Sequence, residues 1–87
     1  MRFEARVDVQ LKSGIADPEG ATIERALSAL GFAGVEHVRA GRSFHFEVEA
    51  ADETSARATA RELTGKLLAN PVIEESAVEV RRCEVLG

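Results

Sequence analysis

A strict alternation of apolar and charged residues at the start of the chain constrains the fold more than any other feature. The apolar positions are Phe3, Ala5, Val7, Val9 and Leu11, and charged or polar residues from Arg2 to Lys12 separate them. Successive side chains of a strand point to opposite faces of a sheet, so this period predicts a strand with one buried face. Residues 43–49 repeat the pattern. Such amphipathic strands are typical of an antiparallel sheet that is covered on one side.

A segment after the first strand has the end signals of a helix. Asp17 precedes Pro18, which is the usual order of a capping acceptor and a first helical residue. Apolar residues then recur at helical spacing until Gly31, and glycine is a common stop signal. These signals predict a helix over residues 18–30.

A second helix is predicted to begin after Asp52 or Thr54, since either residue is able to cap it. It is predicted to end at Asn70, because asparagine tolerates a left-handed backbone and the following Pro71 cannot continue a helix. Its inward line is predicted to consist of Ala56, Ala60, Leu63 and Leu67.

The segment before residues 43–49 allows two interpretations. Residues 35–40 form either a short strand, joined to residues 43–49 by a turn at Gly41 and Arg42, or the first part of one long bent strand. The sequence leaves the hairpin and the bent strand open. A last strand is predicted over about residues 73–82, with Val78 and Val80 on its inner face.

In chain order these elements predict a single α+β domain over residues 1–87, with the order β-α-β(β)-α-β. Since each strand has one apolar face, we expect an antiparallel sheet with two helices on one face, which is a ferredoxin-like layer. The opposite face carries the charged residues of the first strand. We expect this charged face to be exposed to water or to contact another chain.

Size and composition disfavour several classes of function. A chain of 87 residues buries only about 60% of its unfolded surface, so we expect self-association to supplement its small core. The net charge of −4 disfavours nucleic acids, whose phosphates require clustered cations. No apolar run approaches the roughly 20 residues of a membrane span. A single cysteine permits no internal disulfide, and we expect a cytoplasmic protein without membrane contact.

Residues with catalytic potential form no recognisable set in the sequence. His45 lies at an outward strand position, and His37 has no neighbour at metal-ligand spacing. Cys83 is interpreted as a small residue at a strand end. Glycines around the first helix start suggest a phosphate loop, but Asp17 occupies the place where a phosphate would bind. We therefore expect no catalytic residues and no cofactor or metal bound by this chain.

Three segments together resemble those of a known family. They are LKSGIADPEG at residues 11–20, VRAGR at residues 38–42 and LLANPVIE at residues 67–74. In this order and at this spacing they are similar to the PurS family, the small subunits of phosphoribosylformylglycinamidine (FGAM) synthase in purine biosynthesis. The similarity extends over almost the whole chain.

The resemblance implies a non-catalytic subunit of an ATP-dependent ligase complex. It implies a homodimer or a dimer of dimers that bridges a large synthetase subunit and a glutaminase subunit and supports ammonia transfer between them. ATP and magnesium are expected on the large subunit. Residues of the family-like segments are then candidates for the partner interface: Lys12, Asp17, Arg39, Arg42, Asn70 and Glu74.

Two other classes of small α+β domain share this order of elements. An ACT-like regulatory domain would bind amino acids at a dimer interface, and titration with amino acids would reveal it. An RRM-like module would stack bases on aromatic side chains of the open sheet face. The first strand has no aromatic residue at its outward positions, so the ACT-like domain is the main alternative.

Overall fold

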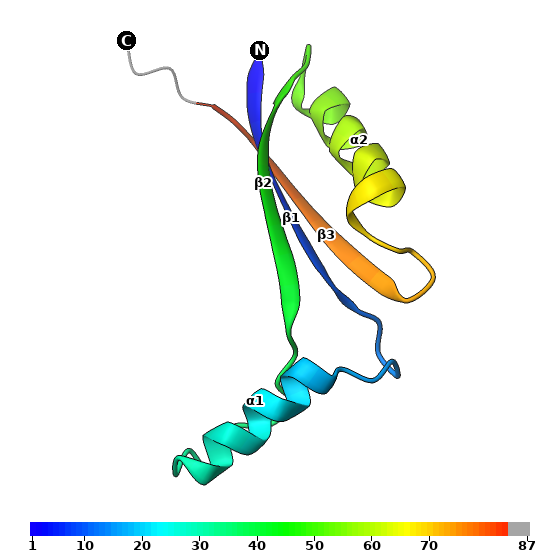
Figure 1. Cartoon of the computed structure of the whole chain (residues 1–87). Helices are drawn as coiled ribbons and strands as arrows, with labels where there is room; N and C mark the ends of the chain where they lie inside the picture. Colours follow the sequence, from blue (N-terminus) through cyan, green and yellow to red (C-terminus); the bar gives the residue numbers. More distant parts are fainter. Residues whose placement is uncertain (84–87) are drawn as a thin grey trace.

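The structure is a computed structural model that describes residues 1–83, and its elements follow the order expected from the sequence. They are β1 (Arg2–Leu11), α1 (Pro18–Ala29), β2 (Gly41–Glu49), α2 (Glu53–Leu63), the π-helical turn η1 (Thr64–Leu68) and β3 (Glu74–Arg82), as Figure 1 shows. Residues 84–87 of the predicted domain lie outside the described part of the chain.

The three strands form one antiparallel sheet in the order β2-β1-β3, with the amphipathic β1 at its centre. Val7 lies opposite Phe44 of β2 and Val78 of β3, so the apolar positions of all three strands share one face. A slip of one residue would turn every apolar side chain of a strand to the other face, which is why this register is selected. The predicted antiparallel α+β architecture is confirmed.

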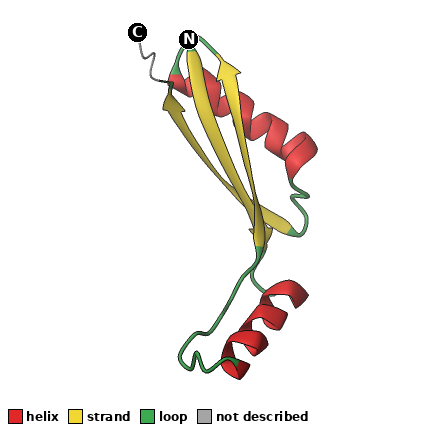
Figure 2. Cartoon of the chain, turned by 60° about the vertical axis from the view of Figure 1, so that its left-hand side comes forward, coloured by secondary structure: helices red, strands yellow, loops and turns green. Residues whose placement is uncertain are grey.

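Helix α2 covers the apolar face of the sheet and forms the core with it (Figure 2). Ala56 and Ala60 have no exposed surface, and their small side chains let the helix approach the strands closely. The strand residues buried in this core are Phe3, Ala5, Val48 and Val80. Of the two possible caps, Asp52 and not Thr54 begins the helix, because Oδ1 of Asp52 accepts the N–H of Ser55 at 2.8 Å.

The end of α2 differs from the prediction. The helix continues into η1, where the Ala69 N–H donates to the Thr64 carbonyl at 2.9 Å, five residues back. This wider turn brings Thr64 into the core and leaves Leu67 81% exposed. The inward placement of Leu67 was therefore wrong, because the added residue breaks the helical period. Asn70 follows the turn without a left-handed backbone, which occurs at only one non-glycine residue of 1–83, His37.

Helix α1 departs furthest from the prediction, because it does not lie on the sheet. Figures 1 and 2 show it beyond the end of the sheet, and the main packing contacts of the described elements join only the strands, α2 and η1. The expectation that both helices cover one face is thus wrong for a single chain. The radius of gyration is 16.8 Å, whereas a compact domain of this length has about 12 Å. The chain therefore carries α1 as an extended arm.

Residues 35–40 adopt neither of the two predicted arrangements. Strand β2 begins at Gly41, where a turn was expected, and the preceding segment lies outside the sheet. The N–H groups of Val38 and Ala40 donate to the carboxylates of Glu24 and Asp17, at 3.0 and 2.8 Å. Because these amides already have partners in and before α1, the segment is held against the helix and adds no strand.

Candidate partner interface

The six residues selected from the sequence lie at one end of the sheet, where β1 leads to α1 and where β2 and β3 begin. The Lys12 N–H donates to the Ile73 carbonyl at 2.9 Å, which joins the loop after β1 to the loop before β3. The other five residues form two clusters beside this bond. We name them the arm clasp, made by Asp17, Glu24 and Arg39, and the loop anchor, made by Arg42, Asn70 and Glu74.

Asp17 is the centre of the arm clasp. Its Oδ1 accepts the Gly20 N–H at 2.9 Å and its Oδ2 accepts the Ala40 N–H at 2.8 Å. These two hydrogen bonds, and then the Arg39 guanidinium at 4.0 Å, hold the pKa of Asp17 below its usual value. A methyl group on Gly20 would lie 2.4 Å from the Val38 carbonyl oxygen. Only glycine allows the helix and residues 35–40 to come this close.

Arg39 and Glu24 complete the arm clasp. The Arg39 Nη2 donates to the carbonyl of Leu11 and, at 3.4 Å, to that of Lys12. Glu24 accepts the Val38 N–H from the middle of α1. Both chain segments that connect α1 to the sheet are thus cross-linked by hydrogen bonds to charged groups, which are stronger than neutral ones. The arm has a defined direction for this reason.

The loop anchor fixes the turn before β3. The Arg42 Nη2 donates to Oε2 of Glu74 at 2.9 Å and to the Leu68 carbonyl at 3.2 Å. Oε1 of Glu74 accepts the Asn70 N–H at 2.7 Å, and this bond, followed by the Arg42 guanidinium, keeps the pKa of Glu74 below its usual value. Oδ1 of Asn70 in turn accepts the Val72 N–H at 3.0 Å. Asn70 therefore acts through its side chain, which starts the turn.

These contacts are intramolecular, and they give the candidate residues a first role inside the chain. The side chains of Asp17 and Glu74 are mostly covered. Lys12 is exposed, and its ammonium group has no ion-pair partner within residues 1–83. Among the six candidates, Lys12 is thus the side chain most available to another molecule. A role of these residues in partner binding stays a prediction.

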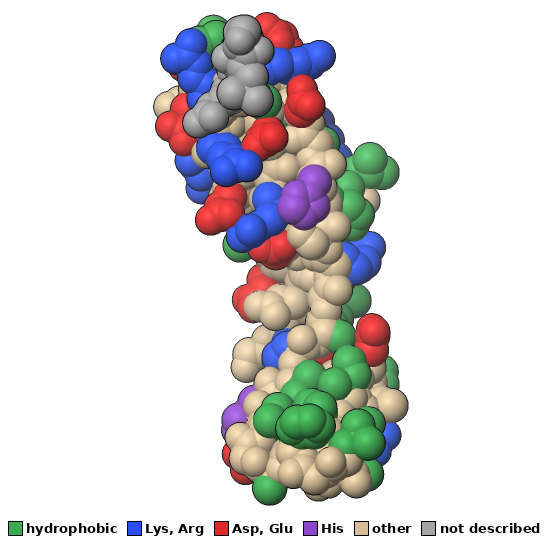
Figure 3. Space-filling view, turned by 90° about the vertical axis from the view of Figure 1, so that its left-hand side faces the viewer, with side chains coloured by type: hydrophobic (Ala, Val, Ile, Leu, Met, Phe, Trp, Pro, Cys, Tyr) green, Lys and Arg blue, Asp and Glu red, His purple; other side chains and the backbone are tan. Residues whose placement is uncertain are grey.

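An exposed apolar surface on α1 and the loop after it was missed by the sequence analysis. We name it the arm patch, and it consists of Ile23, Leu30, Phe32 and Val35. Leu30 is 73% exposed and Phe32 is 56% exposed. Figure 3 shows hydrophobic side chains gathered on this lobe of the molecule. The signal in the sequence was that apolar residues, Phe32 and Val35, continue past Gly31, where the helix was expected to end. Apolar patches of this kind mark interaction sites.

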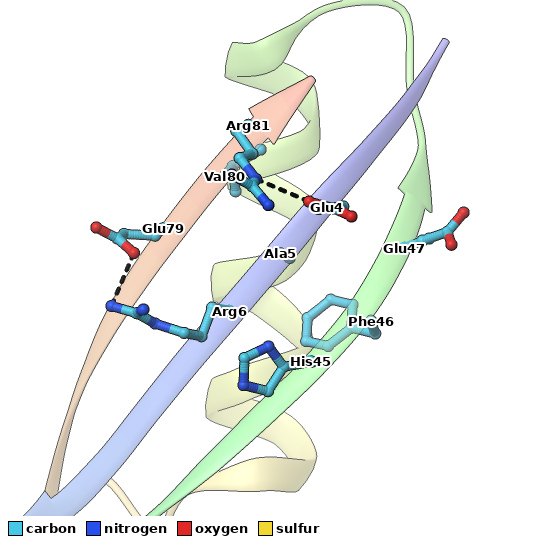
Figure 4. Close-up of a pocket in the computed structure, with 9 residues that line it drawn as sticks. All are labelled: Glu4, Ala5, Arg6, His45, Phe46, Glu47, Glu79, Val80 and Arg81. Atoms are coloured by element: carbon cyan, nitrogen blue, oxygen red, sulfur yellow. Dashed lines mark hydrogen bonds and ion pairs between the residues drawn. The ribbon is translucent and has the colours of Figure 1, made fainter. Parts of the chain in front are cut away.

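The open face of the sheet carries charged pairs. A shallow hollow of about 640 Å³ lies there, and Figure 4 shows the residues that line it. Among them, Arg6 pairs with Glu79 at 2.8 Å and Arg81 pairs with Glu4 at 2.7 Å. Within residues 1–83, no three His, Cys, Asp or Glu side chains converge to hold a metal. Burial, and then nearby carboxylates, raise the pKa of Cys83, which opposes a nucleophilic role. No helix of this part of the chain is long and apolar enough to cross a membrane.

The fold and these contacts define a small α+β subunit with an uncovered helical arm. The sequence model of PurS, described as phosphoribosylformylglycinamidine (FGAM) synthase, matches residues 4–82. The chain therefore belongs to the PurS family, whose members are subunits of FGAM synthase, a ligase complex of purine biosynthesis. The resemblance of the three segments is confirmed, and neither the ACT-like nor the RRM-like alternative is the family found.

Curated relatives and solved structures agree with this assignment. The PurS subunit of Methanocaldococcus jannaschii is 38% identical over 82 residues, which are 94% of this chain and 99% of the relative. The subunit of Thermotoga maritima is 41% identical over 76 residues, which are 87% and 93% of the two chains. The crystal structure of Methanocaldococcus jannaschii PurS has a TM-score of 0.85 at 36% identity, with 94% of this chain and 99% of that chain covered. A chain of the Thermotoga maritima PurLQS structure has a TM-score of 0.86 at 38% identity, with 93% and 99% covered.

Proposed function

We propose that this chain is the subunit through which FGAM synthase joins its large synthetase subunit to its glutaminase subunit and guides ammonia between them. Membership of the PurS family and the similarity to a chain of the PurLQS structure support this proposal. In this proposal the large subunit binds ATP, magnesium and formylglycinamide ribonucleotide, and this chain binds no cofactor. The complex converts that ribonucleotide, glutamine, ATP and water into FGAM, glutamate, ADP and phosphate in the cytoplasm.

The observation that carries the proposal is the arm patch. The arm clasp holds α1 away from its own sheet, so the apolar side chains of the arm patch remain in water in an isolated chain. Burial of large apolar side chains stabilises association by roughly 1.5–3 kcal/mol for each one that is fully buried. We infer that a second copy covers the arm patch, which makes the assembly unit a homodimer or a dimer of dimers.

Sedimentation equilibrium at micromolar concentration tests this dimer. The expected mass is two or four times the 9.4 kDa of one chain. A variant with Leu30→Asp and Phe32→Asp is expected to shift the mass toward one chain, because it would bury two charges in the contact. Thr59→Asp, at an exposed position of α2, is the matched control and should leave the mass unchanged. A single-chain mass for the unchanged protein contradicts the proposal.

Contact with the other subunits is proposed around Lys12 and Val72. Val72 is 77% exposed, and the hydrogen bond between Lys12 and Ile73 places the two residues at the same end of the sheet. An exposed cation beside an apolar side chain suits a partner surface with an acidic rim, because such complementarity sets the register of an interface. The acidic net charge of this chain makes Lys12 a distinctive feature of its surface.

Reconstitution with the purified large and glutaminase subunits tests this contact. Lys12→Glu and Val72→Asp are expected to lower glutamine-dependent FGAM synthesis, while ammonia-dependent synthesis by the large subunit suffers less. Arg61→Glu on the exposed side of α2 is the charge-matched control. Full glutamine-dependent activity of both variants contradicts the proposed location.

Charge reversal of Arg39 and Arg42 is predicted to have the same effect on the two activities. The free energy of unfolding of this double variant is measured first, because Arg42 pairs with Glu74 and Arg39 belongs to the arm clasp, so the substitutions also remove contacts within the chain.

The isolated chain is expected to show no ligase, glutaminase or ATPase activity, since its described residues form no catalytic set. ATP hydrolysis that copurifies with the chain through successive columns contradicts the assignment of catalysis to the partner subunits.

A further inference from the structure

Arg39 and Arg42 stand close together in the chain, yet their side chains join different parts of the molecule. Arg39 belongs to the arm clasp, and its Nη2 donates to the carbonyls of Leu11 and Lys12 at the end of β1. Its Nε lies 4.0 Å from Oδ2 of Asp17, which caps α1. One guanidinium group therefore joins the two chain segments that connect α1 to the sheet.

Arg42 makes a corresponding link across the sheet. Its Nη2 donates to Oε2 of Glu74 in β3 at 2.9 Å and to the Leu68 carbonyl at 3.2 Å. Because β1 lies between β2 and β3, this ion pair spans the end of the central strand. The guanidinium carbon also lies 5.5 Å from the centre of the Phe44 ring, at the distance of a cation–π contact. Arg42 thus ties the turn before β3 to the opposite edge of the sheet.

Gly41 holds the segment between these two links against β1. A methyl carbon at Gly41 would lie 2.5 Å from the Val9 carbonyl oxygen and 3.3 Å from Cβ of Gln10. Any larger residue would therefore push the start of β2 away from the central strand. Figure 1 shows this start of β2 at the junction between α1 and the sheet. We name residues 39–42 the splint, because they are bound to the arm at one end and to the turn before β3 at the other.

We propose that Arg39 and Arg42 are positioning residues for ammonia transfer. Through the splint they hold the arm patch and the surface around Lys12 and Val72 at a fixed separation. The proposal rests on the proposed function, in which these two surfaces bind different chains. In that function glutamine is hydrolysed on one subunit and the ammonia is used on another, so the yield depends on how accurately the subunits are aligned. A misplacement of about 1 Å can cost about a hundredfold in rate.

The contacts of the two guanidinium groups distinguish this role from a contact by charge alone. The Nη2 atom of each arginine already donates to two acceptors within the chain. Lysine would keep the positive charge, but it lacks the second nitrogen that faces Asp17 from Arg39 and the planar group that lies over Phe44 from Arg42. A contact by charge would therefore survive substitution by lysine, whereas the positioning role would not.

Reconstitution with the purified large and glutaminase subunits, at saturating concentrations of this chain, tests the positioning role. The double variant Arg39→Lys with Arg42→Lys is expected to lower the kcat of glutamine-dependent FGAM synthesis about tenfold, because alignment and not charge is lost. Ammonia-dependent synthesis should stay unchanged, and more than one glutamate should form for each FGAM. Arg57→Lys is the matched control, since Arg57 also donates to a carboxylate, of Glu53, and to a backbone carbonyl, of Val78.

The outcomes separate the positioning role from the proposed function. Full glutamine-dependent activity of the lysine double variant, with one glutamate for each FGAM, overturns the positioning role and leaves the proposed function intact. Glutamine-dependent synthesis that does not require the unchanged chain overturns both.

Hydrogen exchange of the chain without its partner subunits tests the splint directly. Asp17→Ala removes the carboxylate at the arm end of the splint. Exchange of the Asn70 N–H, which donates to Oε1 of Glu74 at 2.7 Å at the other end, is expected to become several-fold faster. Asp52→Ala is the matched control, because it removes the cap of α2 and leaves the splint untouched. Exchange of the Asn70 N–H at the same rate in both variants overturns the splint.

Discussion

Replacement of Gly20 by alanine sets two opposite effects against each other. In a helix interior alanine is more favourable than glycine by about 0.5–1 kcal/mol, because glycine loses more backbone freedom on folding. In this chain the new methyl carbon would lie 2.4 Å from the Val38 carbonyl oxygen and 2.7 Å from Oδ2 of Asp17. Overpacking against groups that cannot move away costs about 1–3 kcal/mol. The steric effect is larger, and Gly20→Ala is expected to destabilise the protein by about 1–2 kcal/mol.

Gly65→Ala is the matched control, because a methyl carbon at Gly65 would meet no atom within 4 Å. It is expected to be neutral or stabilising by up to about 1 kcal/mol. Urea and thermal unfolding are measured at one protein concentration, since association changes the apparent stability. For a domain of this size, 1 kcal/mol corresponds to a shift of about 4–8 °C in Tm.

Hydrogen exchange provides the local readout of the same substitution. If the Val38 carbonyl is pushed away from α1, the N–H groups of Val38 and Ala40 lose their carboxylate partners and exchange faster. Equal stability of the Gly20→Ala and Gly65→Ala proteins, with unchanged protection of these two amides, would refute the close approach as the reason for glycine.

Acid is expected to destabilise the protein, because the pKa values of Asp17, Asp52 and Glu74 are lowered in the folded state. The contribution of these carboxylates to the free energy of unfolding is present above their unfolded pKa of about 4, and it is lost as the pH falls through the lower folded pKa values. A free energy of unfolding in urea that does not change between pH 5 and pH 2 contradicts this expectation. Asp17→Asn should recover only part of the stability lost in Asp17→Ala, because one amide oxygen cannot replace two carboxylate oxygens, and exchange of the Ala40 N–H should report the loss. The Cys83 thiol should react with iodoacetamide at pH 8 more slowly than free cysteine, since burial raises its pKa; equal rates argue against this burial.

Local patterns were sufficient for much of the fold. The alternation in β1 identified the buried face of the sheet, and each residue predicted to face inward there from Phe3 to Val9 is buried. Asp17 and Pro18 marked the start of α1 correctly, because a cap acts on an N–H group only three residues away. The family resemblance also depended on short segments, and it identified the family of the chain.

The candidate site could be predicted only in part. The family-like segments led to Lys12, Asp17 and Arg42, which the structure brings to one end of the sheet. They did not reveal Glu24 as a member of the arm clasp, because a glutamate inside a helix has no local signal for a partner 14 residues away. Nor did they show that the charges of Arg42 and Glu74 face each other across 32 positions.

The periods of the strands and helices and the start of α1 follow from the sequence by itself, since they arise from neighbours a few residues apart. The position of α1 beyond the sheet, the start of β2 at Gly41 and the exposure of Leu67 were decided by the tertiary structure. The N–H groups of residues 38 and 40 are able to donate either to a neighbouring strand or to the carboxylates of the arm clasp, and in the folded chain they donate to the carboxylates. Buried or partly buried N–H groups take the partners that the assembled chain brings within reach, and no local pattern records that geometry.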